Sequence, residues 1–295
     1  MAKVIAIAFG RSVDPDHPLQ MVGEKWPVYK DLLTEITKKG YQTAVVSTKD
    51  YTGNGSFGPV HADVVYDRSG GIKFPWPKDS LKVVDSLPFK RLAWDKWLAY
   101  QQLGFAMPVS YLIKSREEIT DNLDKIATRM VVIKPVGGLK GRGLFVGQKA
   151  EAGNFEADFS KGFLIQTFID TSQGIPGIVA GRHDLRLVVM NHRVVWVHVR
   201  TPPEDSLIAN VAGGGTLTEI NLDKLPSKVV QLAQKVIEAI TKEFGNQVYS
   251  IDMGVDPSGC PWVFEINDQM GFPKPEAIGK KRFINELADC LVSEV

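Results

Sequence analysis

Hydrophobic positions in the first third of the chain follow the pattern of a small α/β unit. Residues 3–9 form a continuous apolar run, which is typical of a strand buried on both faces of a sheet. Residues 27–39 carry apolar side chains at helical spacing, and residues 41–47 have the composition of a second strand. A strand, a helix and a strand in this order predict a parallel pair joined by a right-handed crossover. A third strand is expected at 64–66, within an N-terminal domain of residues 1–88.

The rest of the chain alternates helical and strand patterns. Helices are predicted at 92–103, 115–126, 225–244 and 282–292. Strands are predicted at 109–113, 130–134, 144–147, 163–169, 184–190, 193–200, 247–255 and 260–266. The dipeptide Asn191-His192 between two of these strands is typical of a hairpin turn. We therefore expect an α/β (α+β) protein in which a small parallel domain comes first and hairpin-linked strands follow.

Composition and charge exclude several classes of protein. With 35 Lys+Arg against 34 Asp+Glu, the net charge of +1 gives no whole-chain attraction to nucleic acid or to a membrane surface. Two cysteines exclude a disulfide scaffold and a thiolate zinc site, and the five histidines lack metal-ligand spacing. No apolar stretch approaches the roughly 20 residues of a membrane helix, and the apolar start of the chain is interpreted as a strand rather than a signal peptide. We therefore expect a cytoplasmic protein.

The segment between the strands at 130–134 and 144–147 is rich in glycine and positive charge. It contains Gly137, Gly138, Lys140, Gly141, Arg142 and Gly143. Such a loop can bring several backbone N–H groups close to a phosphate, and Lys134 on the preceding strand can reach phosphate oxygens. The loop is neither a Walker A motif nor a Rossmann fingerprint, because GxxxxGK[ST] is absent and no helix follows. A flexible basic hairpin without a ligand is the alternative.

A second motif brings oxygen ligands together near the end of the chain. Asp252 and Glu265 lie on successive strands, nearly opposite each other, and Asn267 shares a strand face with Glu265. Close carboxylates repel unless a cation lies between them, and a set of oxygen ligands suits Mg²⁺. The alternative is a hairpin whose polar side chains simply face solvent. Asp256 and Asp268 fit that alternative better, because they flank turns.

Two arginines lie on the strands between these motifs. Alternation places Asp184 and Arg186 on one face of a strand, where they face either a cleft or solvent. Arg200 ends a strongly apolar strand and precedes the glycine-rich segment at 210–215. A position facing a phosphate-binding cleft explains Arg200, and a surface ion pair is the alternative.

Taken together, these motifs resemble the ATP-grasp superfamily over about two hundred residues, from Leu92 to the C-terminus. The motifs occur in the family's order: DKW, VVIKP, the glycine-rich loop, LIQTFI, DLR, R…N…GGG and DxG…EIN. The DLR, N…GG and EIN forms are most similar to the branch that holds glutathione synthetase and the ribosomal-protein glutamate ligases. The resemblance implies a pre-grasp α/β domain (1–88), a small lid subdomain (89–169) and a C-terminal subdomain with the metal site (170–295).

The resemblance also implies roles for individual residues. The implied ATP contacts are Lys96, Lys134, Gly137, Gly138, Lys140 and Gly141 at the phosphates, Gln166, Phe168 and Ile169 at the adenine, and Asp184 at the ribose. The implied metal ligands are Asp252, Glu265 and Asn267, for one or two ions of Mg²⁺ or Mn²⁺. Arg186, Arg200 and Asn210 would act on the transferring phosphoryl group and the acyl-phosphate. Thr167 departs from the family, since many relatives carry an acid near this position, so adenine contacts would be mostly backbone.

The implied activity is that of an ATP-dependent carboxylate–amine ligase, which forms an amide or peptide bond and releases ADP and phosphate. A grasp-fold kinase and a non-catalytic nucleotide-binding protein are the alternatives. Expected partners are small-molecule or peptide carboxylates and amines, with no nucleic acid and no membrane; homo-oligomerisation stays open. Arg11 and Arg68 follow strands where α/β sheets present ligands, so they either bind a substrate carboxylate or are ordinary surface arginines.

Overall fold

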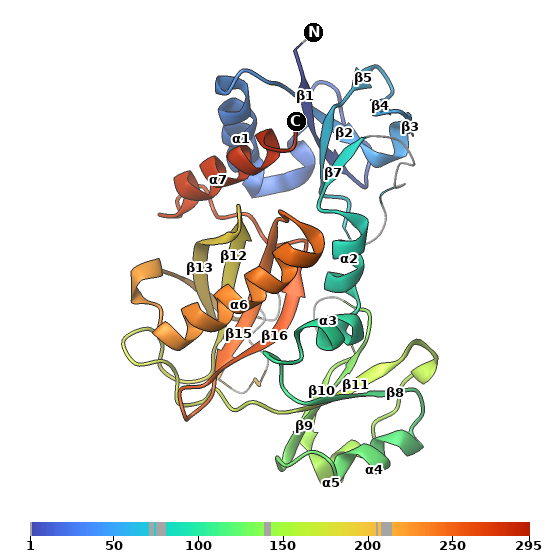
Figure 1. The fold of residues 1–295 in the computed structure, drawn as a ribbon, viewed down its shortest axis with the longest axis vertical. Coiled ribbons are helices and arrows are strands. Elements are labelled where there is room, and N and C mark those ends of the chain that lie inside the picture. Colours follow the sequence, from blue (N-terminus) through green and yellow to red (C-terminus); the bar gives the residue numbers. More distant parts are fainter. Residues whose placement is uncertain (1, 71–73, 75–80, 139–142, 205, 208–213) are drawn as a thin grey trace.

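The computed structural model describes residues 2–70, 74, 81–138, 143–204, 206–207 and 214–295. Three sheets of four or more strands follow one another along the long axis of the molecule (Figure 1). A parallel sheet lies at one end, an antiparallel four-stranded sheet at the other, and a five-stranded sheet between them. This architecture confirms the predicted mixed α/β fold class.

The N-terminal sheet is parallel throughout and has the strand order β2-β1-β6-β7. Its strands are β1 (Val4–Phe9), β2 (Gln42–Ser47), β6 (Val64–Asp67) and β7 (Lys82–Val84). Helix α1 (Trp26–Lys38) buries its apolar stripe in a core shared with β1 and β6. Strand β7 was not predicted, because three residues are too few to show a strand pattern. A small antiparallel sheet follows β2 and consists of β3 (Tyr51–Gly53), β4 (Ser56–Phe57) and β5 (Val60–His61).

The sheet at the opposite end is antiparallel, with the order β10-β9-β11-β8. Its elements are β8 (Ser110–Ile113), β9 (Met130–Pro135), β10 (Phe145–Gln148) and β11 (Phe163–Thr167), with helices α4 (Glu117–Leu123) and α5 (Lys149–Ala152). One face buries Ile113, Ile133 and Ile165 against Ile119 of α4. The other face is turned towards the central sheet.

The central sheet has the order β14-β13-β12-β15-β16, and all its pairs are antiparallel. Its strands are β12 (Asp184–Met190), β13 (Arg193–Thr201), β14 (Thr216–Ile220), β15 (Tyr249–Val255) and β16 (Pro261–Asn267). Helix α6 (Ser227–Phe244) covers one face and buries five apolar residues in a core shared with β12, β13 and β15. The predicted hairpins at Asn191-His192 and at 256–259 are confirmed. Strand β14 was missed, because its sequence TLTEI is polar and exposed along most of its length.

The predicted helix at 92–103 was wrong in one respect. The structure contains two helices, α2 (Leu87–Trp94) and α3 (Lys96–Leu103), separated by Asp95. Asp95 has an extended backbone (φ −95°, ψ 104°), and its carboxylate accepts hydrogen bonds from the N–H groups of Trp97 and Leu98. The residue therefore acts as the N-cap of α3, which is a common role for aspartate. The break sets Lys96 at the first position of α3.

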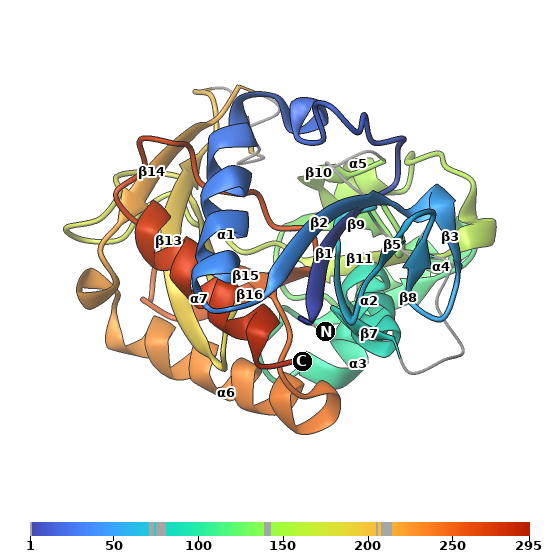
Figure 2. The ribbon, with the colours of Figure 1, turned by 90° about the horizontal axis from the view of Figure 1, so that it is seen from above.

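The last helix, α7 (Lys280–Val292), returns to the N-terminal sheet and packs beside α1, as Figures 1 and 2 show. Two ion pairs link the helices: Lys280 to Asp31 at 3.0 Å, and Lys39, directly after α1, to Asp289 at 2.7 Å. One hydrophobic core therefore joins the N-terminal unit to the end of the chain. The described residues also form the short helices η1 (Gln20–Lys25), η2 (Thr48–Asp50), η3 (Phe159–Lys161) and η5 (Leu222–Lys224). Among the helices of the described ranges, none has both the length and the apolar character needed to cross a membrane.

Candidate active site

A cavity of about 650 Å³ lies between the antiparallel end sheet and the central sheet. Its wall on the end sheet is largely apolar and includes Val132 and Val146, with Phe264 of β16 opposite. Its wall on the central sheet carries the charged residues of β12, β13, β15 and β16. The cavity therefore combines an apolar part with a charged part, which suits a ligand that has a flat ring at one end and phosphates at the other.

Phe264 is held in the apolar part by a glycine. A Cβ atom on Gly254 of β15 would lie 2.3 Å from Phe264 Cζ and 2.7 Å from Thr171 Cγ2. The register of β15 and β16 also shifts between Asp252 and Met253, which marks an irregularity in β16 at Phe264. The glycine and the irregularity together let the Phe264 ring lie against the sheet.

The segment that follows β11 forms one edge of the apolar part. Gln166 is buried and lines the cavity, and its Nε2 donates to Ser110 Oγ at 2.7 Å, which anchors its side chain to β8. Phe168 and Ile169 line the cavity directly after the strand. Their backbone groups therefore lie where a bound ring can reach them, whereas the Gln166 amide nitrogen is already bonded to Ser110.

Two lysines from different elements meet at the charged part. Lys134 on β9 donates from Nζ to the carbonyl of Phe264 at 3.2 Å. Lys96 at the start of α3 donates to the carbonyl of Gly138 at 3.1 Å, and its Nζ lies 3.8 Å from Glu265 Oε2. Burial lowers the pKa of Lys134 to about 8, and nearby Lys96 acts in the same direction, while Glu265 opposes them. Within the described part of the chain, Lys134 is therefore a buried amine without a close carboxylate partner of its own.

Gly137 brings the start of the glycine-rich loop against α3. It forms an isolated bridge with Asp95, and a Cβ atom there would lie 3.0 Å from Trp94 Nε1. Gly138 lines the cavity beside Lys96. Three predicted site residues, Lys140, Gly141 and Asn210, lie outside the described residues.

Arg186, Arg200, Asp184 and Asp252 form one buried ion-pair network on the central sheet. Arg186 donates from Nε and Nη2 to the two oxygens of Asp252, at 2.7 and 2.6 Å. Arg200 donates from Nη2 to Asp252 Oδ2 at 2.8 Å and to Asp184 Oδ2 at 2.5 Å. The pairing of β12 with β13 and β15 explains this, because Asp184 lies opposite Arg200 and Arg186 lies opposite Asp252. The ion pairs of Arg200 are therefore buried and lie beside the cavity, unlike the surface ion pair that was the alternative.

The two carboxylates of this network have opposite pKa shifts. Burial alone would raise the pKa of Asp252, but Arg186 and Arg200 outweigh it and lower the pKa to about 2. For Asp184, burial and the charge of Asp252 raise the pKa to about 8, against the opposing effect of Arg200 and Arg186. Asp252 is therefore the firmly charged carboxylate that holds both guanidinium groups in place on the central sheet.

Glu265 and Asn267 occupy the β16 side of the charged part. The predicted opposition of Asp252 and Glu265 is confirmed by the strand register. The Asn267 amide nitrogen donates to Asp252 Oδ2 at 3.1 Å, and the Glu265 side chain is 34% exposed towards the cavity. Among the described residues, no three His, Cys, Asp or Glu side chains lie close enough to hold a metal ion by themselves. The oxygens of Glu265 and Asn267 nevertheless fit Mg²⁺, which usually binds few protein ligands and takes water and phosphate oxygens for the rest. Both oxygens of Asp252, the third predicted ligand, already accept hydrogen bonds from the arginines.

Sequence reasoning missed several residues of the cavity. His198 lies between the two arginines of the network; burial, followed by their charges, lowers its pKa to about 3, so the imidazole is neutral. Its position two residues before Arg200 could have identified it, since both share a strand face. Gln269 and Phe272 also line the cavity, but they follow β16 in an irregular segment that no sequence period describes. Of the two arginines considered for substrate binding, Arg11 is exposed, and Arg68 donates to the carbonyl of Met270 at 3.1 Å.

Comparisons with known proteins agree with this geometry. Residues 93–290 match the family model described as the RimK-like ATP-grasp domain. A probable alpha-L-glutamate ligase of Stenotrophomonas maltophilia (strain R551-3) is 30% identical over 190 residues, which cover 62% of this chain and 60% of that protein. The chain therefore spans about 60% of the length of this relative.

Solved structures share the fold at low sequence identity. The RimK domain ATP-grasp protein of Sphaerobacter thermophilus has a TM-score of 0.68 at 16% identity, covering 99% of this chain and all of that one. The ATP-grasp ligase PsnB, solved with a minimal precursor, Mg and ADP, has a TM-score of 0.62 at 15% identity, covering 99% of this chain and 96% of that one. Since the family model covers about two thirds of the residues, the chain belongs to the RimK-like ATP-grasp family.

Proposed function

We propose that this protein is an ATP-dependent ligase that joins a carboxylate to an amine through an acyl-phosphate. The observation that carries the proposal is the meeting of Lys96, Lys134, the arginine pair and the Glu265–Asn267 strand end in one cavity. All of these groups come from motifs that belong to the family. Each suits an anionic, phosphate-bearing ligand, and none of them is a covalent nucleophile.

ATP would lie across the two parts of the cavity. Its adenine fits between Val132, Val146 and Phe264, with hydrogen bonds from the backbone of 167–169. Its phosphates would extend towards Lys96 and Lys134, which approach from α3 and β9. The solved complex of PsnB with Mg and ADP supports the same cofactors here.

Glu265 and Asn267 would hold magnesium, which would neutralise charge on the phosphate oxygens. The carboxylate substrate attacks the γ-phosphorus of ATP, and the bond to the β,γ-bridging oxygen breaks to release ADP. The amine then attacks the carbonyl carbon of the acyl-phosphate, and inorganic phosphate leaves as the amine loses a proton. Arg186 and Arg200 would stabilise the negative charge that develops in both steps, because they are preorganised by Asp252.

The substrate class follows from the relative's name. Because the chain is similar to a probable alpha-L-glutamate ligase, we propose L-glutamate as the first candidate amine. The carboxylate would be that of a small molecule or a peptide. The neutral His198 beside the arginines would accept or donate a hydrogen bond to this substrate without adding charge.

The test is an ATP-turnover assay with L-glutamate and a panel of amino acids and peptides as carboxylates. A ligase releases inorganic phosphate and gives a product heavier by one glutamyl residue in the mass spectrum. Phosphate recovered on the acceptor would mean a kinase, and nucleotide binding without turnover would mean a binding protein. Glu265→Gln should lose turnover, whereas Lys235→Ala, a change at an exposed position on α6, serves as the matched control.

A further inference from the structure

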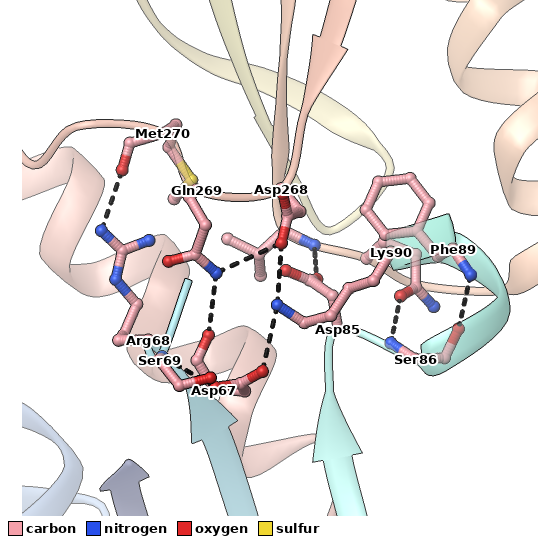
Figure 3. Close-up of polar contacts among 12 residues, drawn as sticks. Asp67, Arg68, Ser69, Asp85, Ser86, Phe89, Lys90, Asp268, Gln269 and Met270 are labelled. Atoms are coloured by element: carbon pink, nitrogen blue, oxygen red, sulfur yellow. Dashed lines mark hydrogen bonds and ion pairs between the residues drawn. The ribbon is translucent and has the colours of Figure 1, made fainter. Parts of the chain in front are cut away.

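A buried lysine outside the cavity joins segments that are far apart in the sequence (Figure 3). Lys90 lies on α2 and is fully buried, at 0% exposure. Its Nζ donates to Asp268 Oδ2 at 2.8 Å and lies 3.2 Å from Asp67 Oδ2. Asp67 is the last residue of β6, and Asp268 directly follows Asn267 at the end of β16. One ammonium group therefore connects the N-terminal sheet to the strand that carries Glu265 and Asn267.

The residues after Asp268 are held by the same edge of the N-terminal sheet. Gln269 Nε2 donates to the carbonyl of Asp67 at 3.1 Å and to Asp268 Oδ2 at 3.3 Å. Arg68 donates from Nη2 to the carbonyl of Met270 at 3.1 Å (Figure 3). The segment that leaves β16 is thus fixed at three successive residues, and its second residue, Gln269, already lines the cavity.

Lys90 carries its charge in this cluster. Burial would lower the pKa of Lys90, but Asp67 and Asp268 outweigh it and raise the pKa, so the amine is charged. Asp85, a third buried acid, accepts a hydrogen bond from the N–H of Val248, and burial raises its pKa to about 8. Lys90 is therefore a charged donor to Asp268 rather than a neutral filler of the core. Such a bond has a direction, whereas apolar packing alone leaves a segment free to shift.

We propose that Lys90 is a positioning residue for the phosphate end of the site. By holding Asp268, Lys90 fixes the end of β16, so that Glu265 and Asn267 present their oxygens to magnesium and the nucleotide phosphates. This inference rests on the proposed function, because it assumes that these two residues share magnesium with the nucleotide. It gives the N-terminal sheet a part in nucleotide binding, although that sheet lies outside the part of the chain that matches the family model.

The test measures how much Mg²⁺ tightens the binding of ADP, by calorimetry in EDTA and in Mg²⁺. In Asp268→Asn and Lys90→Met we expect the affinity for ADP in EDTA to stay within about twofold of the unmodified protein. The tightening by Mg²⁺ should fall at least about tenfold. A purely structural lysine would change the melting temperature without changing this ratio. Asp85→Asn, a change of a neighbouring buried acid that bonds to Val248 instead, is the matched control and should keep the full effect of Mg²⁺.

Lys90→Met leaves two buried carboxylates without their partner, so its folding is the weak point of the test. A triple variant, in which Asp67→Asn and Asp268→Asn accompany Lys90→Met, restores a neutral cluster of similar size. Folded triple and Asp268→Asn proteins that keep the full effect of Mg²⁺ would overturn the inference. An unmodified protein that binds ADP equally with and without Mg²⁺ would instead overturn the proposed function, and the positioning role with it.

Discussion

The buried Lys134 ammonium should make nucleotide affinity depend on pH in a range where ATP itself no longer titrates. Its pKa in the free protein is about 8, below the ordinary value of 10.5. A bound phosphate favours the charged amine and should raise its pKa well above this value. In the free protein, the Lys134 amine is about 90% protonated at pH 7, half protonated at pH 8 and about 10% protonated at pH 9. Between pH 7 and pH 9 the dissociation constant for ATP should therefore rise about tenfold, which corresponds to about 1.4 kcal/mol.

The same shift acts on stability with the opposite sign. Because the folded pKa lies below the unfolded pKa, the unfolded chain binds more protons between about pH 8 and pH 10.5. The free energy of unfolding of the nucleotide-free protein should therefore gain from Lys134 as the pH rises through this range, while ATP binding weakens.

Calorimetry in two buffers of different ionisation enthalpy measures the proton uptake directly. We expect about half a proton taken up per ATP bound at pH 8, and none in Lys134→Met. Comparing the two proteins removes the contribution of the other titrating side chains. An ATP affinity of the unmodified protein that is as flat with pH as that of Lys134→Met would refute the reasoning.

Three further substitutions test other parts of the site. Glu265→Gln should abolish turnover and leave the melting temperature nearly unchanged, because the side chain is partly exposed; full activity at low Mg²⁺ would remove Glu265 from the metal site. Arg200→Ala should lower kcat by about 10²–10³ with little change in ATP affinity, and should also lower stability, because the buried side chains of Asp252 and Asp184 lose the partner that they share. Steady-state kinetics well below the melting temperature separate these effects, and an unchanged kcat in the folded variant would exclude Arg200 from catalysis. Gly254→Ala should lower stability in urea by about 1–3 kcal/mol and weaken ADP binding, since its Cβ displaces Phe264 into the adenine slot; unchanged ADP affinity would show that the ring is not part of that slot.

Most strands could be predicted from the sequence, because a strand pattern depends only on residues that are adjacent along the chain. The opposition of Asp252 and Glu265 followed from the turn between their strands, which sets the register. The arginine network did not follow, since it depends on which strands pair across the sheet. The apolar spacing predicted one helix across Asp95, but the structure has two. The Asp95 side chain caps the second helix, and a hydrophobic pattern does not show such a cap.

Lys90 shows why the rest of the molecule could not be predicted. On a short helix it looks like an ordinary exposed lysine, and Asp268 looks like an ordinary turn residue. Their contact exists only because the N-terminal sheet is folded against the end of β16, which joins residues 178 positions apart. The sequence patterns describe each element but not the partner it packs against.

The pairing of α1 with α7 has a consequence for how the chain is made. The ribosome synthesises α7 long after α1, so part of the apolar surface around α1 has no cover while the residues between the two helices are being translated. The N-terminal sheet can form early, but its core closes only after α7 has emerged. Folding of this unit is therefore completed only once α7 is available, and until then the growing polypeptide presents an apolar surface of the kind that chaperones recognise. Mutations in α7 that loosen this contact should lower the yield of folded protein in cells more than they lower its activity once folded.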